Sequence, residues 1–148
     1  MADSAEPPPS PDPRSARPRV LVVDDSIVVR KVLAMTVRQL PGFGDVVIDE
    51  AGNGAIALKK LAAHRYRFVL SDVRMPLMDG LELVSRIRND LKDGETPVVL
   101  ISTLGTQDDV DRGVAAGATA YVIKPLSPHH IRLALLEILR EKRPRDGP

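Results

Sequence analysis

Three aspartates of this chain follow short apolar runs and are its strongest candidates for chemistry. Asp24 and Asp25 come directly after the apolar run at 20–23, and Asp72 ends the run at 68–72. If both runs are parallel strands of one sheet, the three carboxylates lie at the same edge. Each pair of like charges about 4 Å apart would repel by roughly 4 kcal/mol at an effective dielectric near 20. A hard divalent cation relieves this repulsion, so the pattern predicts an Mg²⁺ site with positions open to a phosphoryl group.

Two further apolar runs end in a hydroxyl and an amine. Ser102 ends the run at 98–102, and Lys124 follows the run at 120–123. A carboxylate attacks phosphorus as a nucleophile once negative charge is screened, which makes Asp72 the candidate nucleophile. Lys124 then supplies a compact positive charge to the phosphoryl oxygens, and Ser102 supplies a hydroxyl donor.

The predicted metal ligands come from the same strand ends. Asp25 and Asp72 are expected to ligate Mg²⁺ together with one backbone carbonyl, most simply that of Arg74. Asp24 is expected to act through bound water or to tune the site. Pro125 is predicted to hold the turn after Lys124 through a cis peptide bond.

Composition excludes several other classes of protein. The net charge is +1, from 21 basic and 20 acidic residues, so no long-range field attracts nucleic acid or a membrane surface. The chain has no cysteine and three scattered histidines, which argues against disulfides and structural zinc. It also lacks the roughly 20-residue apolar stretch of a membrane span and the features of a signal peptide, so we expect a cytoplasmic protein.

Proline separates the ends of the chain from one folded domain. Six prolines among residues 1–18 deny hydrogen-bond donors to helix or sheet and predict a disordered, Pro-rich tail. Residues 143–148 predict a flexible C-terminal tail in the same way. The domain is therefore expected to span residues 19–142, which is enough chain to bury a core.

Short apolar runs alternate with amphipathic stretches through this domain, which predicts an α/β fold of five βα units around a doubly wound parallel sheet. The predicted strands are 19–23, 46–50, 68–72, 98–102 and 120–123. The predicted helices are about 27–40, 54–64, 81–89, 107–116 and 128–143. Ser26 is expected to cap the first helix, and Gly117 to form the left-handed turn after the fourth.

Four segments, 20–26, 70–80, 97–102 and 117–125, closely resemble the motifs of response-regulator receiver domains, the CheY-like proteins of two-component signalling. The resemblance covers residues 19–142 and several motifs in the same order. It implies a flavodoxin-like fold with strand order 2-1-3-4-5. It also implies a single-domain signalling protein rather than a metabolic enzyme. Such a signalling protein catalyses its own phosphorylation and dephosphorylation.

The resemblance assigns a role to each residue that matches a motif. The implied roles are phosphoacceptor for Asp72, acidic metal pair for Asp24 and Asp25, switch hydroxyl for Ser102, phosphate-binding lysine for Lys124 and switch aromatic for Tyr121. The implied cofactor is Mg²⁺. The phosphoryl donor would be a histidine kinase or a phosphotransfer protein, and the pathway would be chemotaxis, motility control or a phosphorelay.

Two surfaces are expected to meet protein partners. Phosphorylation would alter the face made by helix 107–116, strand 120–123 and helix 128–143, where a downstream target would bind. Leu133 and Leu136 fall outside the core-facing stripe of the last helix, so this face is also a candidate for a weak phosphorylation-dependent dimer of an otherwise monomeric protein. Near the acidic pair, the first helix is expected to expose a second surface, which resembles the kinase-docking side of receivers. Its expected residues are Ile27, Arg30, Lys31 and Ala34.

Three alternatives stay open at this point. An Mg²⁺-dependent aspartyl phosphatase usually carries a second aspartate two residues after its nucleophile, where this chain has Arg74. A pseudo-receiver would keep the fold as a binding module without accepting phosphate. The chain could also be a receiver cut from a larger regulator, although it shows no DNA-binding or kinase motif.

Overall fold

The structure is a computed structural model that describes residues 17–124 and 127–142. Over these residues, five strands alternate with five helices, as the apolar runs predict. The strands are β1 (Arg19–Val23), β2 (Val47–Ala51), β3 (Phe68–Asp72), β4 (Val98–Ser102) and β5 (Ala120–Ile123). The helices are α1 (Ile27–Arg38), α2 (Gly54–Ala63), α3 (Gly80–Asn89), α4 (Gln107–Ala116) and α5 (Pro128–Lys142).

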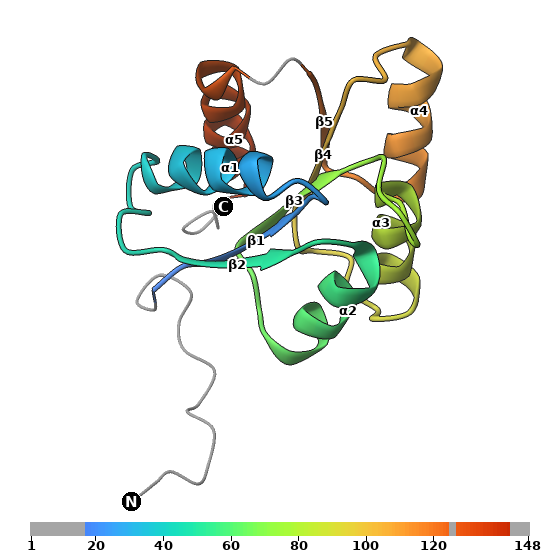
Figure 1. The fold of residues 1–148 in the computed structure, drawn as a ribbon, viewed down its shortest axis with the longest axis horizontal. Helices are drawn as coiled ribbons and strands as arrows, with labels where there is room; N and C mark the ends of the chain where they lie inside the picture. The colour runs from blue at the N-terminus through green and yellow to red at the C-terminus, as the bar shows by residue number, and fades with distance from the viewer. Residues whose placement is uncertain (1–16, 125–126, 143–148) are drawn as a thin grey trace, which may run out of the picture.

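All four strand pairs are parallel, and the sheet order is β2-β1-β3-β4-β5. The flavodoxin-like fold class is therefore confirmed. Figure 1 shows α1 and α5 on one face of the sheet and α2, α3 and α4 on the other. The order reverses between β1 and β3, and ligands of such sheets bind beyond the carboxyl ends of the strands at that reversal.

Burial on both faces explains why the inner strands are apolar at consecutive positions. In β1, Val20 and Val22 pack in the core below α1 and α5, whereas Leu21 and Val23 pack in the core below α2 and α3. Successive side chains of a strand point to opposite faces, so a strand covered on both faces needs an unbroken apolar run. The same rule explains β4, whose five residues are all buried.

The predicted helix ends are confirmed at two positions. The hydroxyl of Ser26 accepts a hydrogen bond of 3.2 Å from the amide of Val29, which caps α1. Gly117 follows α4 with a φ of 114°, in the left-handed region that glycine tolerates best.

Several predicted boundaries differ from the observed ones by one or two residues, and two of these differences have a clear cause. β2 begins at Val47 rather than Val46, because the amide of Val46 donates to the carbonyl of Phe43 and closes a turn, although its side chain is buried. Helix α1 ends at Arg38 rather than Leu40 because the amide of Leu40 bonds three residues back, to Val37, in a tighter turn. In both cases a buried apolar side chain extended the pattern past the end of the regular backbone.

The ends of the described chain bear on the predicted domain boundaries. Arg17 donates a hydrogen bond of 3.0 Å to the carbonyl of Asp45, and the carbonyl of the buried Pro18 accepts one of 2.8 Å from Val47. The last two residues of the predicted tail therefore contact the domain. The predictions for 1–16, for 143–148 and for the peptide bond of Pro125 fall outside the described residues. None of the helices in the described ranges has the length and apolar character to cross a membrane.

Candidate active site at the carboxyl edge of the sheet

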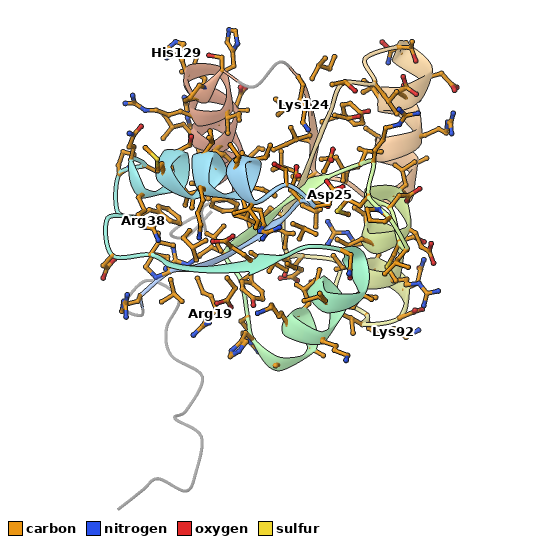
Figure 2. The ribbon with its side chains drawn as sticks, in the orientation of Figure 1. Arg19, Asp25, Arg38, Lys92, Lys124 and His129 are labelled. Carbon is orange, nitrogen blue, oxygen red and sulfur yellow. The ribbon has the colours of Figure 1, made fainter. Side chains whose placement is uncertain are left out.

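The structure brings the three predicted aspartates together at the carboxyl ends of β1 and β3. Carboxylate oxygens of Asp24, Asp25 and Asp72 all lie within 4.8 Å of one another. Asp24 and Asp72 are buried, with exposed fractions of 2% and 8%, whereas Asp25 is exposed. Figure 2 shows Asp25 and Lys124 at this same edge of the molecule. The cluster thus has a buried interior and one side open to solvent.

The turn between β1 and α1 holds Asp24 by its backbone and its side chain. The amide of Asp24 donates to the carbonyl of Ala51 at the end of β2, at 3.0 Å. Its carboxylate accepts a hydrogen bond of 2.8 Å from the amide of Ser26. The same turn therefore positions the first aspartate and starts helix α1.

Gly80 lets the loop after Asp72 fold back against it. A Cβ atom on Gly80 would lie 2.3 Å from the carbonyl oxygen of Asp72, so a larger residue cannot be accommodated without displacement of the backbone. The amide of Gly80 donates to the carbonyl of Val73 at 2.8 Å. Between these points the loop passes through Leu77, which has a φ of 72° and is 86% exposed.

Lys124 is the cation of the cluster. Its ammonium nitrogen lies 3.6 Å from a carboxylate oxygen of Asp72 and 3.9 Å from one of Asp24. Its backbone amide donates to the carbonyl of Ser102 at 2.7 Å, so β4 and β5 together set its position. One ammonium therefore faces two buried carboxylates, and the third carboxylate, that of Asp25, lies beside them.

The electrostatics of the cluster favour an added cation. Burial raises the pKa of Asp24, and the negative charge of Asp72 raises it further, against the amide of Ser26 and the Lys124 ammonium. Burial also raises the pKa of Asp72, although Lys124 and the backbone amides of Val73 and Arg74 oppose it. A divalent cation would stabilise both groups in their ionised form.

The donor set fits Mg²⁺. Three carboxylates supply hard oxygen ligands, which Mg²⁺ prefers, and the exposed side at Asp25 leaves room for water and a phosphoryl group. Asp24, Asp25 and Asp72 are therefore the residues that could hold the metal. Ligation by the backbone carbonyl of Arg74 stays a prediction.

Ser102 and Tyr121 are linked through the loop after β4. The hydroxyl of the buried Ser102 accepts a hydrogen bond of 3.0 Å from the amide of Leu104. The carbonyl of Leu104 accepts one of 2.6 Å from the hydroxyl of Tyr121. A cavity of about 310 Å³ adjoins this link and is lined by Val73, Arg74, Leu81, Leu104, Asp109, Arg112 and Tyr121.

The structure corrects part of both predicted partner surfaces. On α1, Ile27 and Lys31 are exposed as expected, but Ala34 is buried in the domain and Arg30 is partly buried in an ion pair with Glu50. On α5, Leu133 is 51% exposed, whereas Leu136 packs against the core. The helices turn these residues toward the sheet more than the apolar stripes indicated.

Sequence reasoning also missed two contacts to the aspartates. Arg30 donates to the carbonyl of Asp24, and Gly80 packs on the carbonyl of Asp72. The Asp79-Gly80 pair at the start of α3 was a visible signal for a tight approach. Nothing in the sequence alone indicated the target of the Arg30 side chain.

Comparison with known proteins agrees with this geometry. The family model of the response regulator receiver domain matches residues 20–136. The chain is 35% identical to the chemotaxis protein CheY1 of Helicobacter pylori over 122 residues, which cover 82% of this chain and 96% of that protein. It is 41% identical to the two-component response regulator ORR41 of Oryza sativa subsp. japonica over 119 residues, which cover 79% of this chain and 91% of that protein.

A solved structure shares the fold. A chain of the CheX–CheY–BeF3–Mg²⁺ complex from Borrelia burgdorferi superposes with a TM-score of 0.75 and 31% sequence identity. The match covers 82% of this chain and 89% of that one.

Proposed function

This chain belongs to the response regulator receiver family of two-component systems, and on that premise we propose that it carries a phosphoryl group on Asp72 and signals by a change of its surface. The observation that carries the proposal is the position of Asp72. Its carboxylate is buried, lies within 4.8 Å of two other carboxylates, and faces the ammonium of Lys124 at 3.6 Å. Such an arrangement suits an acceptor whose charge must be screened before it attacks.

In the proposed reaction, a carboxylate oxygen of Asp72 attacks the phosphorus of a phosphohistidine on a kinase or phosphotransfer protein. A P–O bond forms and the P–N bond breaks, and the electron pair of that bond goes to the departing imidazole nitrogen, which takes up a proton from water. Bound Mg²⁺ would screen the negative charge of acceptor and phosphoryl group. Dephosphorylation restores the free aspartate: water attacks the phosphorus, the Asp72 carboxylate is the leaving group, and inorganic phosphate is released.

Lys124 and Ser102 act on the transferred group. The ammonium of Lys124 lies beside the carboxylates and attracts phosphoryl oxygens as a point charge. The hydroxyl of Ser102 only accepts in its bond from Leu104, so its proton can be donated to a phosphoryl oxygen. Phosphorylation adds about −1.5 to −2 charge at Asp72, and both groups would respond to it.

The response would reach the surface through Leu104. Ser102 and Tyr121 hold the amide and the carbonyl of this residue, so a movement of the Ser102 hydroxyl shifts the loop on which Tyr121 rests. Tyr121 lies on β5, beside α4. We therefore place the target-binding surface on the face made by α4, β5 and α5.

The phosphoryl donor would dock beside the acidic pair. Ile27 and Val28 are 62% and 71% exposed at the start of α1, two residues or more after Asp25, and Lys31 is exposed one turn later. Apolar side chains beside a cation and an open carboxylate suit a protein partner that must approach Asp72. The relatives include a bacterial chemotaxis protein and a plant two-component response regulator. These residues therefore agree with a chemotaxis role and equally with a phosphorelay role.

Acetyl phosphate tests the proposal directly. Purified protein is incubated with acetyl phosphate and Mg²⁺, and the phosphorylated form is separated on a phosphate-affinity gel. We expect a retarded band for the wild type and for Asp90→Asn, which alters an exposed aspartate at the far end of α3, and none for Asp72→Asn. No retarded band in the wild type would support a pseudo-receiver instead, and a band in Asp72→Asn would refute the assigned acceptor.

A further inference from the structure

Arg30 of helix α1 connects the edge of the sheet to the metal-binding turn. Its Nε donates a hydrogen bond of 2.8 Å to a carboxylate oxygen of Glu50 on β2. Its Nη1 donates one of 2.6 Å to the backbone carbonyl of Asp24. The Arg30 side chain is only 15% exposed, so these two contacts hold it against the protein rather than in solvent.

We propose that Arg30 is a positioning residue for the metal site, which holds the Asp24–Asp25 peptide so that both carboxylates point at the cluster. This inference rests on the proposed function, since it concerns the same Mg²⁺ site. Arg30 does not contact the reacting atoms. It would act through the backbone that carries two of the metal ligands.

The backbone contacts explain how this positioning works. The amide of Asp24 is fixed by the carbonyl of Ala51, and the carbonyl of Asp24 is fixed by Arg30. That carbonyl belongs to the peptide that leads into Asp25, so its orientation sets the direction in which Asp25 leaves the turn. Asp25 is exposed and has less packing of its own to orient it.

The contact requires the forked shape of a guanidinium. Two nitrogens of Arg30 serve two acceptors at once, the side chain of Glu50 and the backbone of Asp24. A lysine ammonium is a single point charge. In place of Arg30 it would make a good hydrogen bond to one of the two acceptors, or weak hydrogen bonds to both. We therefore expect Arg30→Lys to restore only part of the effect of Arg30.

Charge and positioning predict opposite effects on metal binding. A positive charge near the carboxylates repels Mg²⁺, so the loss of the Arg30 charge by itself would strengthen binding. Loss of positioning would weaken it. Glu50 already offsets this charge, because it accepts hydrogen bonds from both Arg30 and Lys31. The sign of the change in affinity therefore separates the two explanations.

Lys31 provides a matched control. It is the next residue of α1, it carries the same charge, and its ammonium donates to the same carboxylate of Glu50 at 2.7 Å, whereas the bond to the carbonyl of Asp24 comes from Arg30. Mg²⁺ is titrated calorimetrically into the wild type, Arg30→Gln, Arg30→Lys and Lys31→Gln, each checked by thermal unfolding. We expect about tenfold weaker binding in Arg30→Gln, as for other groups that orient metal ligands, an intermediate loss in Arg30→Lys, and less than a twofold change in Lys31→Gln.

A second readout needs no metal. The amide of Ser26 donates to the carboxylate of Asp24, so its hydrogen exchange reports the order of the turn. In metal-free protein we expect this amide to exchange at least about fivefold faster in Arg30→Gln, while the amide of Thr119, on the far side of the sheet, changes little. If Arg30→Gln unfolds, Glu50→Gln replaces it, because it weakens the contact that holds the guanidinium. The Ser26 amide should then exchange faster in this folded, metal-free variant, which loss of the Glu50 charge alone would not cause.

The outcomes distinguish this inference from the function on which it rests. A wild type that binds no Mg²⁺ overturns the proposed function, and the role of Arg30 with it. A wild type that binds Mg²⁺, with equal or tighter binding in Arg30→Gln or with unchanged exchange at Ser26, overturns the positioning role alone.

Discussion

The hydroxyl of Tyr121 donates a hydrogen bond of 2.6 Å to the carbonyl of Leu104, the residue whose amide is bound by Ser102. Gly113 of α4 makes room for this arrangement, because a Cβ there would lie 2.8 Å from the Tyr121 ring. One residue of the loop after β4 thus connects a buried hydroxyl near Asp72 to an aromatic ring beside α4.

Tyr121→Phe should uncouple α4 from the phosphorylation site. The variant keeps the ring and loses the bond to Leu104, so we expect about 1 kcal/mol less stability and normal phosphorylation of Asp72. We also expect a smaller change in α4 amide exchange when the phosphate mimic beryllofluoride is added. Tyr66→Phe is the control, since it loses a bond of equal length to Asp49, away from the site. An equal α4 response in wild type and Tyr121→Phe would contradict the link.

Asp72→Asn should stabilise the metal-free protein at neutral pH. Burial raises the pKa of Asp72 above its ordinary value of 3.8, so above pH 3.8 the folded protein binds more protons there than the unfolded chain. Stability is therefore lost as the pH rises through the raised pKa, and an uncharged asparagine avoids that loss. We expect the free energy of unfolding to rise by about 1–2 kcal/mol at pH 7. This is a net gain, because the substitution relieves the repulsion from Asp24 and Asp25 but also loses the attraction to Lys124.

Urea unfolding in EDTA between pH 4 and pH 8 measures this effect. The difference between Asp72→Asn and wild type should grow as the pH rises and should be absent for Asp90→Asn. Mg²⁺ should then stabilise the wild type at pH 7 more than it stabilises Asp72→Asn, because the metal binds the folded site. A wild type that is more stable than Asp72→Asn in EDTA at pH 7 would show that the carboxylates do not strain the fold.

Gly80→Ala should disrupt the site through its backbone. A Cβ placed 2.3 Å from the carbonyl of Asp72 forces β3 and α3 apart, so we expect a loss of at least about 2 kcal/mol of stability and of phosphorylation by acetyl phosphate. Gly94→Ala is the matched control, since a Cβ at Gly94 meets no atom within 4 Å. Denaturant unfolding and the phosphate-affinity gel measure both effects, and two equally stable variants would refute the close approach.

The sequence predicted the sheet and the meeting of the aspartates for one physical reason. Parallel strands that are buried on both faces need unbroken apolar runs, and such runs precede Asp24 and end at Asp72 and Ser102. Parallel packing then places all their carboxyl ends at one edge, so strand assignment was enough to bring Lys124 to the aspartates as well.

Side chains that reach across elements were not predictable in the same way. Arg30 and Lys31 are adjacent cations on one helix, yet one contacts the backbone of Asp24 and the other stays largely exposed. The difference depends on where α1 lies over β2, which no local pattern contains. Leu136 illustrates the same limit, because the breadth of the apolar face of α5 depends on how α1 packs against it.

Leu77→Asn should stabilise the protein. Leu77 has a φ of 72°, where a branched side chain is strained and asparagine is better tolerated, and its side chain is 86% exposed and contributes little packing. We expect a gain of about 0.5–1 kcal/mol in the free energy of unfolding. Leu77→Ala removes the same apolar atoms but lacks the side-chain amide with which asparagine can hydrogen-bond locally in the left-handed region, so it should not show the gain. Equal stability of the asparagine and alanine variants would place the strain elsewhere.

Leu133→Glu should prevent self-association through the face of α4, β5 and α5. Each of these three elements exposes one large apolar side chain, and Val114, Ile123 and Leu133 are 58%, 48% and 51% exposed. We propose that this face responds to phosphorylation, and exposed apolar residues on it would favour a weak dimer when beryllofluoride is bound. Leu136 is unsuitable for this test, because a charge there would disturb the core it packs against.

Sedimentation velocity with Mg²⁺ and beryllofluoride measures the association. We expect the wild type to form a dimer, and the apparent affinity of this dimer to fall at least about tenfold in Leu133→Glu. The dimer should persist in Ile56→Glu, which places the same charge on a 42% exposed site of α2. One buried leucine contributes roughly 1.5–3 kcal/mol, which corresponds to at least a tenfold change. If the wild type stays monomeric with beryllofluoride, the dimer is refuted. The three exposed side chains would then be available to bind a different protein, and a binding assay that compares the wild type with Leu133→Glu would detect this.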